Sequence, residues 1–311
     1  MLAFLETILS GANQGLLYAL LALGVYITFR ILNFADLTTE GSFALGGAVA
    51  AALISNNIEP VSASLIAFLA GGVAGLCTGI LNTKLKIQPI LAGILTMIAL
   101  YSINIRIMGG QPNTSLLRNT TVVTYLENLF HINRIYAILI LGVITVGVII
   151  AVLYWFFGTE IGSAIRATGN NENMCRALGI NTDNTKILAL MIGNGLISLS
   201  GALVAQQQSF SDVSMGIGAI VIGLAAIIIG ETFTSAKFPF WAKMLFVALG
   251  SVIYRILISL IIFADLLEPY DIKLLTAVLV TIALALPKIF AYFKNKNNGK
   301  ALKQKGQINK G

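Results

Sequence analysis

The sequence is poor in charged residues, cysteine and histidine. Only 11% of its 311 residues are charged, whereas 57% are hydrophobic and the mean hydropathy is +0.88. A soluble globular chain has about a quarter charged residues, so this composition excludes that class. The two cysteines, Cys77 and Cys175, lie in an apolar run and in a polar segment. We expect these positions at different depths of a membrane, and therefore no disulfide.

Motifs for catalysis and for nucleotide binding are also missing. There is no GxxxxGK[ST] loop, so if ATP drives this chain, another chain must bind it. Nor does the sequence contain HExxH, CxxC or a nucleophile elbow. The single histidine, His131, lies near Glu127, which is a weak metal-site pattern. We interpret both as ordinary loop residues rather than metal ligands. We predict no enzyme activity, no cofactor and no metal site in this chain.

Long uncharged runs are what the sequence has in abundance. A helix of about twenty apolar residues crosses a hydrocarbon layer of roughly 30 Å, which predicts an all-α polytopic membrane protein. Because short segments can be re-entrant, we expect about 8–10 membrane helices. The second and seventh predicted spans are short and rich in glycine, typical of helices that break part-way and line a cavity. The predicted spans are Ile8–Phe29, Thr38–Ile54, Ser62–Thr83, Pro89–Met108, Arg134–Phe157, Lys186–Gln208, Gly216–Gly230, Trp241–Phe263 and Ile272–Ile289.

A polar insertion, residues 158–186, separates the fifth and sixth spans. Its pattern predicts two short helices with C′ glycines at Gly169 and Gly179. Placing it in the cytoplasm puts 14 of the 20 basic residues on that side, as the positive-inside rule requires. Residue spacing alone leaves two interpretations open: a docking surface for a soluble partner, or a structured connection between spans.

The positive charge is concentrated at the C-terminus. Without the six lysines of residues 291–311 the formal net charge falls from +7 to +1. We interpret these residues as a basic cytoplasmic tail attracted to anionic lipid headgroups, and predict no nucleic-acid partner. Residues 1–290 then form one membrane domain of a multi-pass protein, with residues 158–186 as its main cytoplasmic loop.

Polar side chains near or inside the spans are candidates for a solute path, because an ionised group at the bilayer centre is costly and usually faces a cavity or partner. Asp36 and Glu40 share one helix face. They either line a path or gate, or simply cap and stabilise the start of the second span. The amides could equally hold helices together. The predicted path residues are Asn33, Asp36, Thr38, Thr39, Glu40, Ser42, Asn104, Asn194, Gln206 and Glu231, with Arg106 as a further candidate.

Five segments together suggest a family. They are RATGN (166–170), ALGIN (177–181), LNFADLTTEGSF (32–43), LSGALVAQ (199–206) and MGIGAIVIGLAAIIIGE (215–231). In combination they resemble ABC importer permeases of the branched-chain amino-acid and ribose type. The nearest subgroup is that of tryptophan-type and uncharacterised amino-acid importers.

This resemblance implies a type II-like importer permease in a bacterial cell membrane. It implies two ATPase subunits, an external substrate-binding protein and a second permease copy, which we expect to form a homodimer. It also implies that the insertion carries a coupling helix that docks on the ATPase. The implied docking residues are Arg166, Thr168, Gly169, Asn170, Asn173, Arg176, Ala177, Leu178 and Gly179.

The expected function is import of a small solute, an amino acid with an aromatic one as a candidate, driven by ATP on the partner subunit. One alternative is an ion-coupled secondary transporter in which Asp36, Glu40 and Glu231 carry the coupling ion. The other is an ABC permease for a sugar or nucleoside.

Overall fold

The computed structural model is almost entirely helical, which confirms the predicted fold class. It describes residues 2–234, 238–264, 274, 276–278 and 281. The predicted tail and most of the predicted ninth span lie outside these residues. Within them the elements are α1 (Leu2–Val25), the π-helix η1 (Tyr26–Ile31), α2 (Thr38–Ser55), α3 (Pro60–Thr83), α4 (Pro89–Ile107), β1 (Asn113–Ser115), α5 (Val122–Phe130), α6 (Arg134–Gly158), α7 (Glu160–Asn170), α8 (Glu172–Ala177), α9 (Thr182–Gln208), β2 (Phe210–Asp212), α10 (Ala219–Thr232) and α11 (Phe240–Phe263).

Local sequence explains where several of these helices begin. α3 and α4 both start at a proline, whose fixed φ suits the first helical turn and whose missing N–H costs nothing there. Thr121 caps α5 through a reciprocal pair of bonds with Thr124. The side chains of Thr159, Asn171 and Asn181 cap α7, α8 and α9 in turn.

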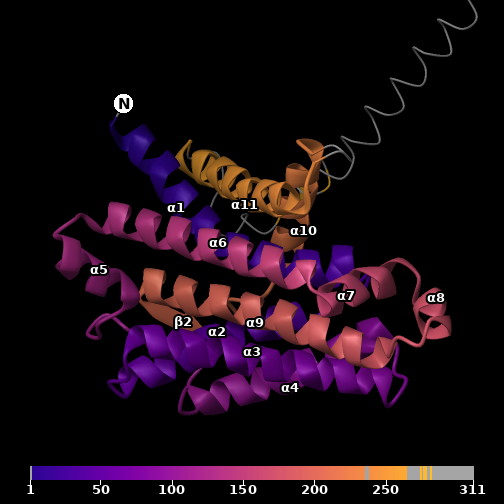
Figure 1. The fold of residues 1–311 in the computed structure, drawn as a ribbon. Coiled ribbons are helices and arrows are strands. Elements are labelled where there is room, and N and C mark those ends of the chain that lie inside the picture. The colour runs from indigo at the N-terminus through magenta and orange to yellow at the C-terminus, as the bar shows by residue number, and fades with distance from the viewer. Residues whose placement is uncertain (1, 235–237, 265–273, 275, 279–280, 282–311) are drawn as a thin grey trace, which may run out of the picture.

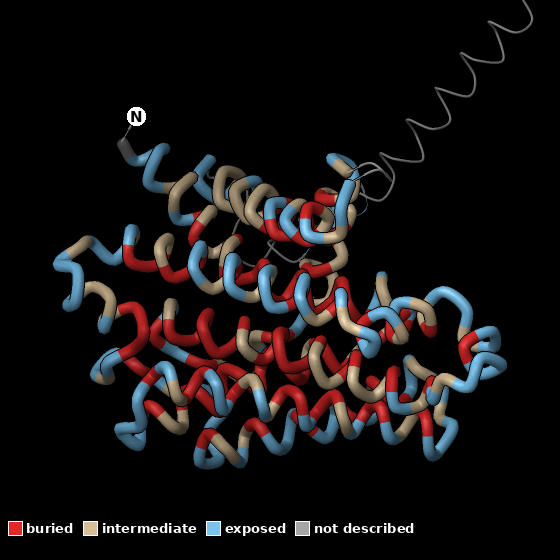
Figure 2. Tube along the Cα trace, in the orientation of Figure 1, coloured by how far each residue is buried: buried red, intermediate tan, exposed pale blue. Residues whose placement is uncertain are grey.

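The helices lie roughly side by side, with α9 in the interior (Figure 1). α9 packs against α1, α2 and α3, while α4 covers α2 and α3 on the outside. α11 packs along α1 and α10. Burial agrees with this arrangement of inner and outer helices: α2 and α9 are mostly buried, whereas α4 exposes one side along its length (Figure 2). The exposed side of α4 is mostly apolar, as expected for a surface that meets lipid, with Ser102 and Arg106 exposed toward its C-terminal end.

Six described helices are long and apolar enough to cross a membrane, and each matches a predicted span. α2 and α10 match two more predicted spans but are not among the six. α2 is continuous from Thr38 to Ser55, so the prediction of a break inside this span is wrong; η1 and the non-helical residues 32–37 precede it. α10 begins at Ala219, and the preceding residues 209–218 contain no α-helix.

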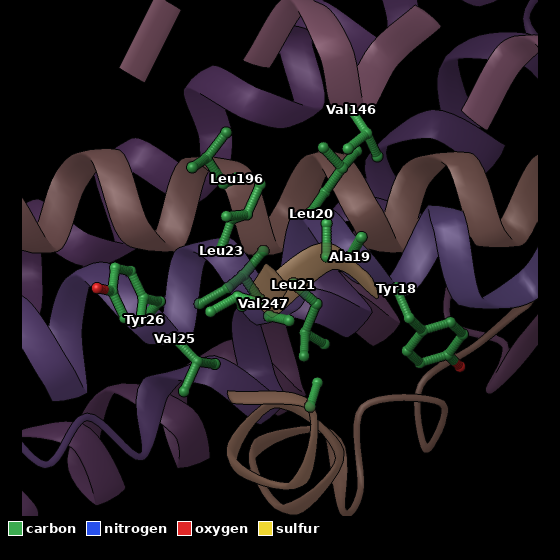
Figure 3. Close-up of a cluster of buried hydrophobic side chains, with 14 of the residues drawn as sticks. Tyr18, Ala19, Leu20, Leu21, Leu23, Val25, Tyr26, Val146, Leu196 and Val247 are labelled. Carbon is green, nitrogen blue, oxygen red and sulfur yellow. The ribbon is translucent and has the colours of Figure 1, made fainter. Parts of the chain in front are cut away.

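Small residues let the central helices approach closely. A Cβ on Gly46 of α2 would overlap the Ser198 backbone of α9, and a Cβ on Gly75 of α3 would overlap the Leu190 carbonyl. Such contacts drive helix association where lipid offers no hydrophobic force. The largest cluster of buried apolar side chains fills the space around α1, with Leu20 and Leu23 at its centre and Val247 of α11 against them (Figure 3).

The two ends of the bundle differ. At one end β1 and β2 pair as a short antiparallel ladder, with Thr114 opposite Ser211 (Figure 1). At the other end α7 and α8 project beyond the long helices (Figure 1). We call these the strand end and the loop end; the sequence predicts that the loop end is cytoplasmic.

Candidate functional site

The loop end consists of two short helices held by their own polar contacts. Arg166 of α7 donates to Ser163 Oγ at 3.2 Å, and its guanidinium lies 5.6 Å from the ring centre of Phe240 at the start of α11. Such a cation–π contact stabilises an exposed site by about 0.5–1 kcal/mol. Arg166 therefore ties α7 to α11 and also remains exposed at the surface.

α8 is fixed by an ionic cluster around Glu172. Arg176 Nη2 and Lys186 Nζ lie 2.8 and 2.7 Å from the two oxygens of Glu172, and Arg176 Nε donates to Thr182 Oγ1 at 2.8 Å. Partial burial opposes ionisation of Glu172, but the bond from Lys186 and the charges of Lys186 and Arg176 outweigh it. The pKa of the Glu172 carboxyl consequently lies below its usual value. Arg176 is thus a structural residue of the loop as well as an exposed one.

Seven of the nine predicted docking residues are exposed, and two are not. Leu178, at the end of α8, is 70% exposed, and Met174 beside it is 49% exposed. Thr168 is buried and bonds to Thr185 of α9 at 3.1 Å. The exposed members are Arg166, Asn170, Asn173, Arg176, Ala177, Leu178 and Gly179.

Gly169 corrects the helix boundary predicted from sequence. It lies inside α7, which continues to Asn170, and it does not adopt a positive φ. Its lack of a side chain matters because a Cβ there would overlap the Ile31 carbonyl oxygen at the end of η1. By contrast Gly179 has φ +83°, so its prediction as the C′ residue is confirmed. Thr168 and Gly169 therefore face the membrane domain and set the position of α7.

From η1 the chain enters a closed polar cluster in the centre of the bundle. Asn194 of α9 donates to Asp36 Oδ2 at 2.6 Å, and the Thr38 N–H donates to Asp36 Oδ1 at 2.9 Å. Ser42 Oγ donates to Asn194 Oδ1 at 2.7 Å. Thr39 Oγ1 donates to the Asp36 carbonyl oxygen at 3.0 Å. All five residues are buried, and the two hydrogen bonds accepted by the Asp36 side chain join the start of α2 to the middle of α9.

Threonine hydroxyls extend this cluster to the outer helices. Thr38 and Thr78 of α3 lie 2.7 Å apart, and Thr78 donates to Thr96 of α4 at 3.0 Å. Sequence reasoning did not select Thr78 or Thr96, because a threonine in an apolar helix satisfies its own hydroxyl from the preceding turn and so gives no signal. The cluster links α2, α3, α4 and α9.

Glu40 belongs to a different region, where residues 209–218 run beside α2. The Gly218 N–H donates to Glu40 Oε1 at 2.9 Å, so Glu40 caps the start of α10 rather than the first turn of its own helix. Gly216 lies against the Glu40 carbonyl oxygen so closely that a Cβ would overlap it. A pocket of about 390 Å³ opens here, lined by Glu40 and Asn104 among others.

The remaining predicted path residues divide by location. Asn33 is exposed with φ 56°, a conformation that asparagine tolerates. Glu231 at the end of α10 pairs with Arg30 of η1 at 2.6 Å. Gln206 lies at the strand end, where it donates to Ser64 at 2.8 Å and accepts the Val122 N–H at 3.0 Å, so its contacts hold helices together. The structure thus brings together Asp36, Thr38, Thr39, Ser42 and Asn194, places Glu40 beside Asn104, and leaves Asn33, Gln206 and Glu231 elsewhere.

A bundle of apolar crossing helices, with polar clusters in its interior and a projecting helical loop at one end, defines a polytopic membrane transport protein. Residues 7–285 match the family described as branched-chain amino acid transport system / permease component, and the chain belongs to that family. It is thus an ABC-type permease and a multi-pass protein of the bacterial plasma membrane.

The names of similar proteins refer to different solutes. The chain is 41% identical to a tyrosine transport system permease protein of Clostridioides difficile (strain R20291), over 93% of this chain and 94% of that one. It is 33% identical to an uncharacterized protein of Rickettsia prowazekii (strain Madrid E), over 91% and 99%. It is 27% identical to a ribose import permease protein of Escherichia coli (strain K12), over 69% and 65%. No solved structure matches the chain.

Proposed function

We propose that this chain is the translocating subunit of an ATP-driven importer for an amino acid, with an aromatic amino acid as the first candidate. Two ATPase subunits dock at the loop end, an external binding protein delivers the solute at the strand end, and a second copy of the chain completes the path. Residues 1–290 are the membrane domain, residues 158–186 the coupling loop and residues 291–311 a basic cytoplasmic tail.

The observation that carries this proposal is an exposed apolar tip on an otherwise polar loop. Met174 and Leu178 face solvent at the end of α8, although the same helix buries Cys175. Large apolar side chains that are exposed at a rigid position suit a protein partner better than water. The ionic cluster of Glu172 keeps α8 in place, so the tip is presented rather than left loose.

A route leads from that tip to the membrane interior. α7 contacts η1 where Gly169 meets Ile31, and the following residues reach Asp36 and its bond to Asn194. Packed contacts of this kind leave no free space, because protein interiors are packed as densely as organic crystals. Movement of α7 with a bound ATPase would therefore displace the start of α2, and with it the path.

The substrate class rests on similarity to the relatives. The tyrosine permease aligns along nearly the whole chain at 41% identity, whereas the ribose permease aligns over about two thirds at 27%. This difference favours an amino acid over a sugar. Since ABC-type permeases use a partner ATPase, family membership also counts against the ion-coupled alternative.

Co-purification tests the docking surface. The tagged permease is expressed with the ATPase encoded beside it, as wild type, as Leu178→Glu and as a matched control, Leu117→Glu. Leu117 is 82% exposed and follows β1 at the opposite end of the molecule. We expect the ATPase to accompany the wild type and Leu117→Glu but to be lost from Leu178→Glu. Equal recovery with all three would contradict docking at α8.

A further inference from the structure

The pocket beside Glu40 has hydrogen-bond acceptors that are not all satisfied. Asn104 is 1% exposed and its amide nitrogen donates to the Gly41 carbonyl oxygen at 3.3 Å, but its Oδ1 has no hydrogen-bond partner among the described residues. A buried polar atom without a partner typically costs about 1–3 kcal/mol. Asn104 lines the pocket, although less than 1 Å² of its Oδ1 is accessible, so a ligand there can remove this cost once a rotation of the amide exposes the oxygen.

Glu40 adds a negative charge to the same wall. One carboxylate oxygen accepts the Gly218 N–H, and the other forms no hydrogen bond within the described residues. Glu40 is also the single charged residue among those that line the pocket. A carboxylate and an unpaired amide oxygen are both acceptors, so this wall fits a ligand with several donors and a positive charge, such as a primary ammonium group.

The rest of the pocket is apolar. Met97, Ile98 and Tyr101 of α4 and Ile217 also line it. A volume of about 390 Å³ lies within the range of small-molecule sites, about 300–1,000 Å³. The non-helical residues 213–218 form one side, and irregular backbone at membrane depth is tolerated where it lines a cavity.

A positive group lies further toward the strand end. Ser102 lines both this pocket and a second hollow that contains Arg106. Arg106 is one helical turn beyond Ser102 on α4, about 6 Å along the axis. It is exposed and forms no ion pair within the part of the chain that the structure describes. A solute that enters from the strand end would meet Arg106 first and the Glu40 wall second.

We propose that this pocket is a low-affinity subsite for an amino acid in transit, with Glu40 and Asn104 Oδ1 as acceptors for its ammonium group. Arg106 is the first partner for its carboxylate, and the apolar wall accommodates its side chain. This proposal deepens the proposed function and rests on it. Its closest structural alternative is that Glu40 only caps α10.

Ligand-observed saturation-transfer NMR measures such weak binding directly. The permease–ATPase complex in lipid nanodiscs is mixed with L-tyrosine, or with 3-(4-hydroxyphenyl)propionate, which lacks only the amino group. Glu40→Gln is the central variant, because glutamine keeps an oxygen acceptor for the Gly218 N–H and removes only the charge. Asn104→Leu removes the second acceptor. Glu59→Gln, at an exposed site next to α3, is the matched control.

We expect L-tyrosine to give a signal with the wild type and Glu59→Gln, and to bind at least about tenfold more weakly to Glu40→Gln and Asn104→Leu. The propionate should bind weakly throughout, without dependence on Glu40. Equal binding of both compounds, no effect of Glu40→Gln, or no tyrosine signal at all would overturn the subsite.

ATP-driven uptake by the same wild-type complex separates the two proposals. Uptake of an amino acid together with an unchanged NMR signal in Glu40→Gln would reject the subsite and keep the proposed function. Uptake of ribose but of no amino acid would reject the proposed substrate class.

Discussion

Residues 26–37 and residues 209–218 both lack α-helix and lead into the short helices α2 and α10, but the polar groups beside them are satisfied to different extents. The first interruption ends at Asp36, whose two carboxylate oxygens are bonded to Thr38 and Asn194. The second ends beside Glu40 and Asn104, where acceptors remain free and a pocket opens. The comparison teaches that a break in a membrane helix can serve two purposes. In our proposals the closed break at Asp36 passes movement of α7 on to α2, and the open break beside Glu40 leaves room for a solute.

The largest expected effect comes from replacing one asparagine of each region, Asn194 or Asn104, with leucine. Asn194→Leu leaves Asp36 Oδ2 and the Ser42 hydroxyl without their hydrogen-bond partner in the buried interior, and each unsatisfied buried polar group costs about 1–3 kcal/mol. Asn104→Leu removes one bond of 3.3 Å together with an unpartnered oxygen, so its cost should stay below about 1 kcal/mol.

Thermal unfolding of the purified variants, followed by fluorescence-detected size exclusion, measures both costs. We expect Asn194→Leu to be poorly folded or strongly destabilised and Asn104→Leu to remain near wild type. Similar losses for both variants would mean that the two breaks do not differ in this way.

The next effect concerns the contact between the coupling loop and the closed break. Gly169→Ala places a Cβ against the Ile31 carbonyl oxygen, and overpacking of this kind costs about 1–3 kcal/mol. We expect the variant to bind the ATPase but to import less solute per ATP hydrolysed. The matched control is Gly147→Ala in α6, where nothing lies within 4 Å of the added atom. An unchanged ratio of solute uptake to ATP hydrolysis would show that the contact of α7 with η1 does not affect the path.

A smaller effect is expected where the two regions are joined. Arg30 lies one residue before the end of η1 and Glu231 one residue before the end of α10, and their side chains pair at 2.6 Å with 59% and 35% exposure. Screening by solvent limits such a pair to about 0.2–1 kcal/mol. A double-mutant cycle with Arg30→Ala and Glu231→Ala should give a coupling energy in this range. Additive single effects would show that the pair does not link the two breaks.

The smallest effect tests whether the loop keeps its shape independently of either break. Because the folded-state pKa of Glu172 is lowered, its stabilisation is present above the unfolded pKa and is lost as pH falls through the folded pKa. The hydrogen-exchange protection factors of α8, which correct for the pH dependence of intrinsic exchange, should therefore fall on acidification below about pH 4, the usual range of a glutamate. In Glu172→Gln they should already be low at pH 7, and their acid dependence should be weaker. Equal protection in both proteins at pH 7 would show that Glu172 does not stabilise α8.

Sequence patterns predicted the membrane class, six long spans and the polar loop, because these depend on hydropathy and on capping residues that act locally. They also brought Asp36 and Ser42 into one candidate set with Asn194. They could not separate the closed break from the open one. Whether Glu40 bonds to its own helix or to Gly218 depends on packing between segments about 180 residues apart.

Gly169 shows the same limit at a single residue. A glycine near the end of a short helix is typical of a C′ position, and Gly179 has that role. At Gly169 the glycine is instead required because η1 lies against α7, a contact that leaves no local signal in the sequence. Thr78 and Thr96 were missed for a related reason, since the bonds of Thr78 with Thr38 and with Thr96 form between separate helices.

The most direct test of the central claim is uptake by proteoliposomes that contain the permease and its ATPase, with the binding protein and labelled L-tyrosine outside. ATP is enclosed in one sample and omitted from another, and ionophores collapse all ion gradients in both. We predict accumulation that requires enclosed ATP and the binding protein and that persists with ionophores present. Accumulation that continues without ATP and disappears with ionophores would contradict an ATPase-coupled permease.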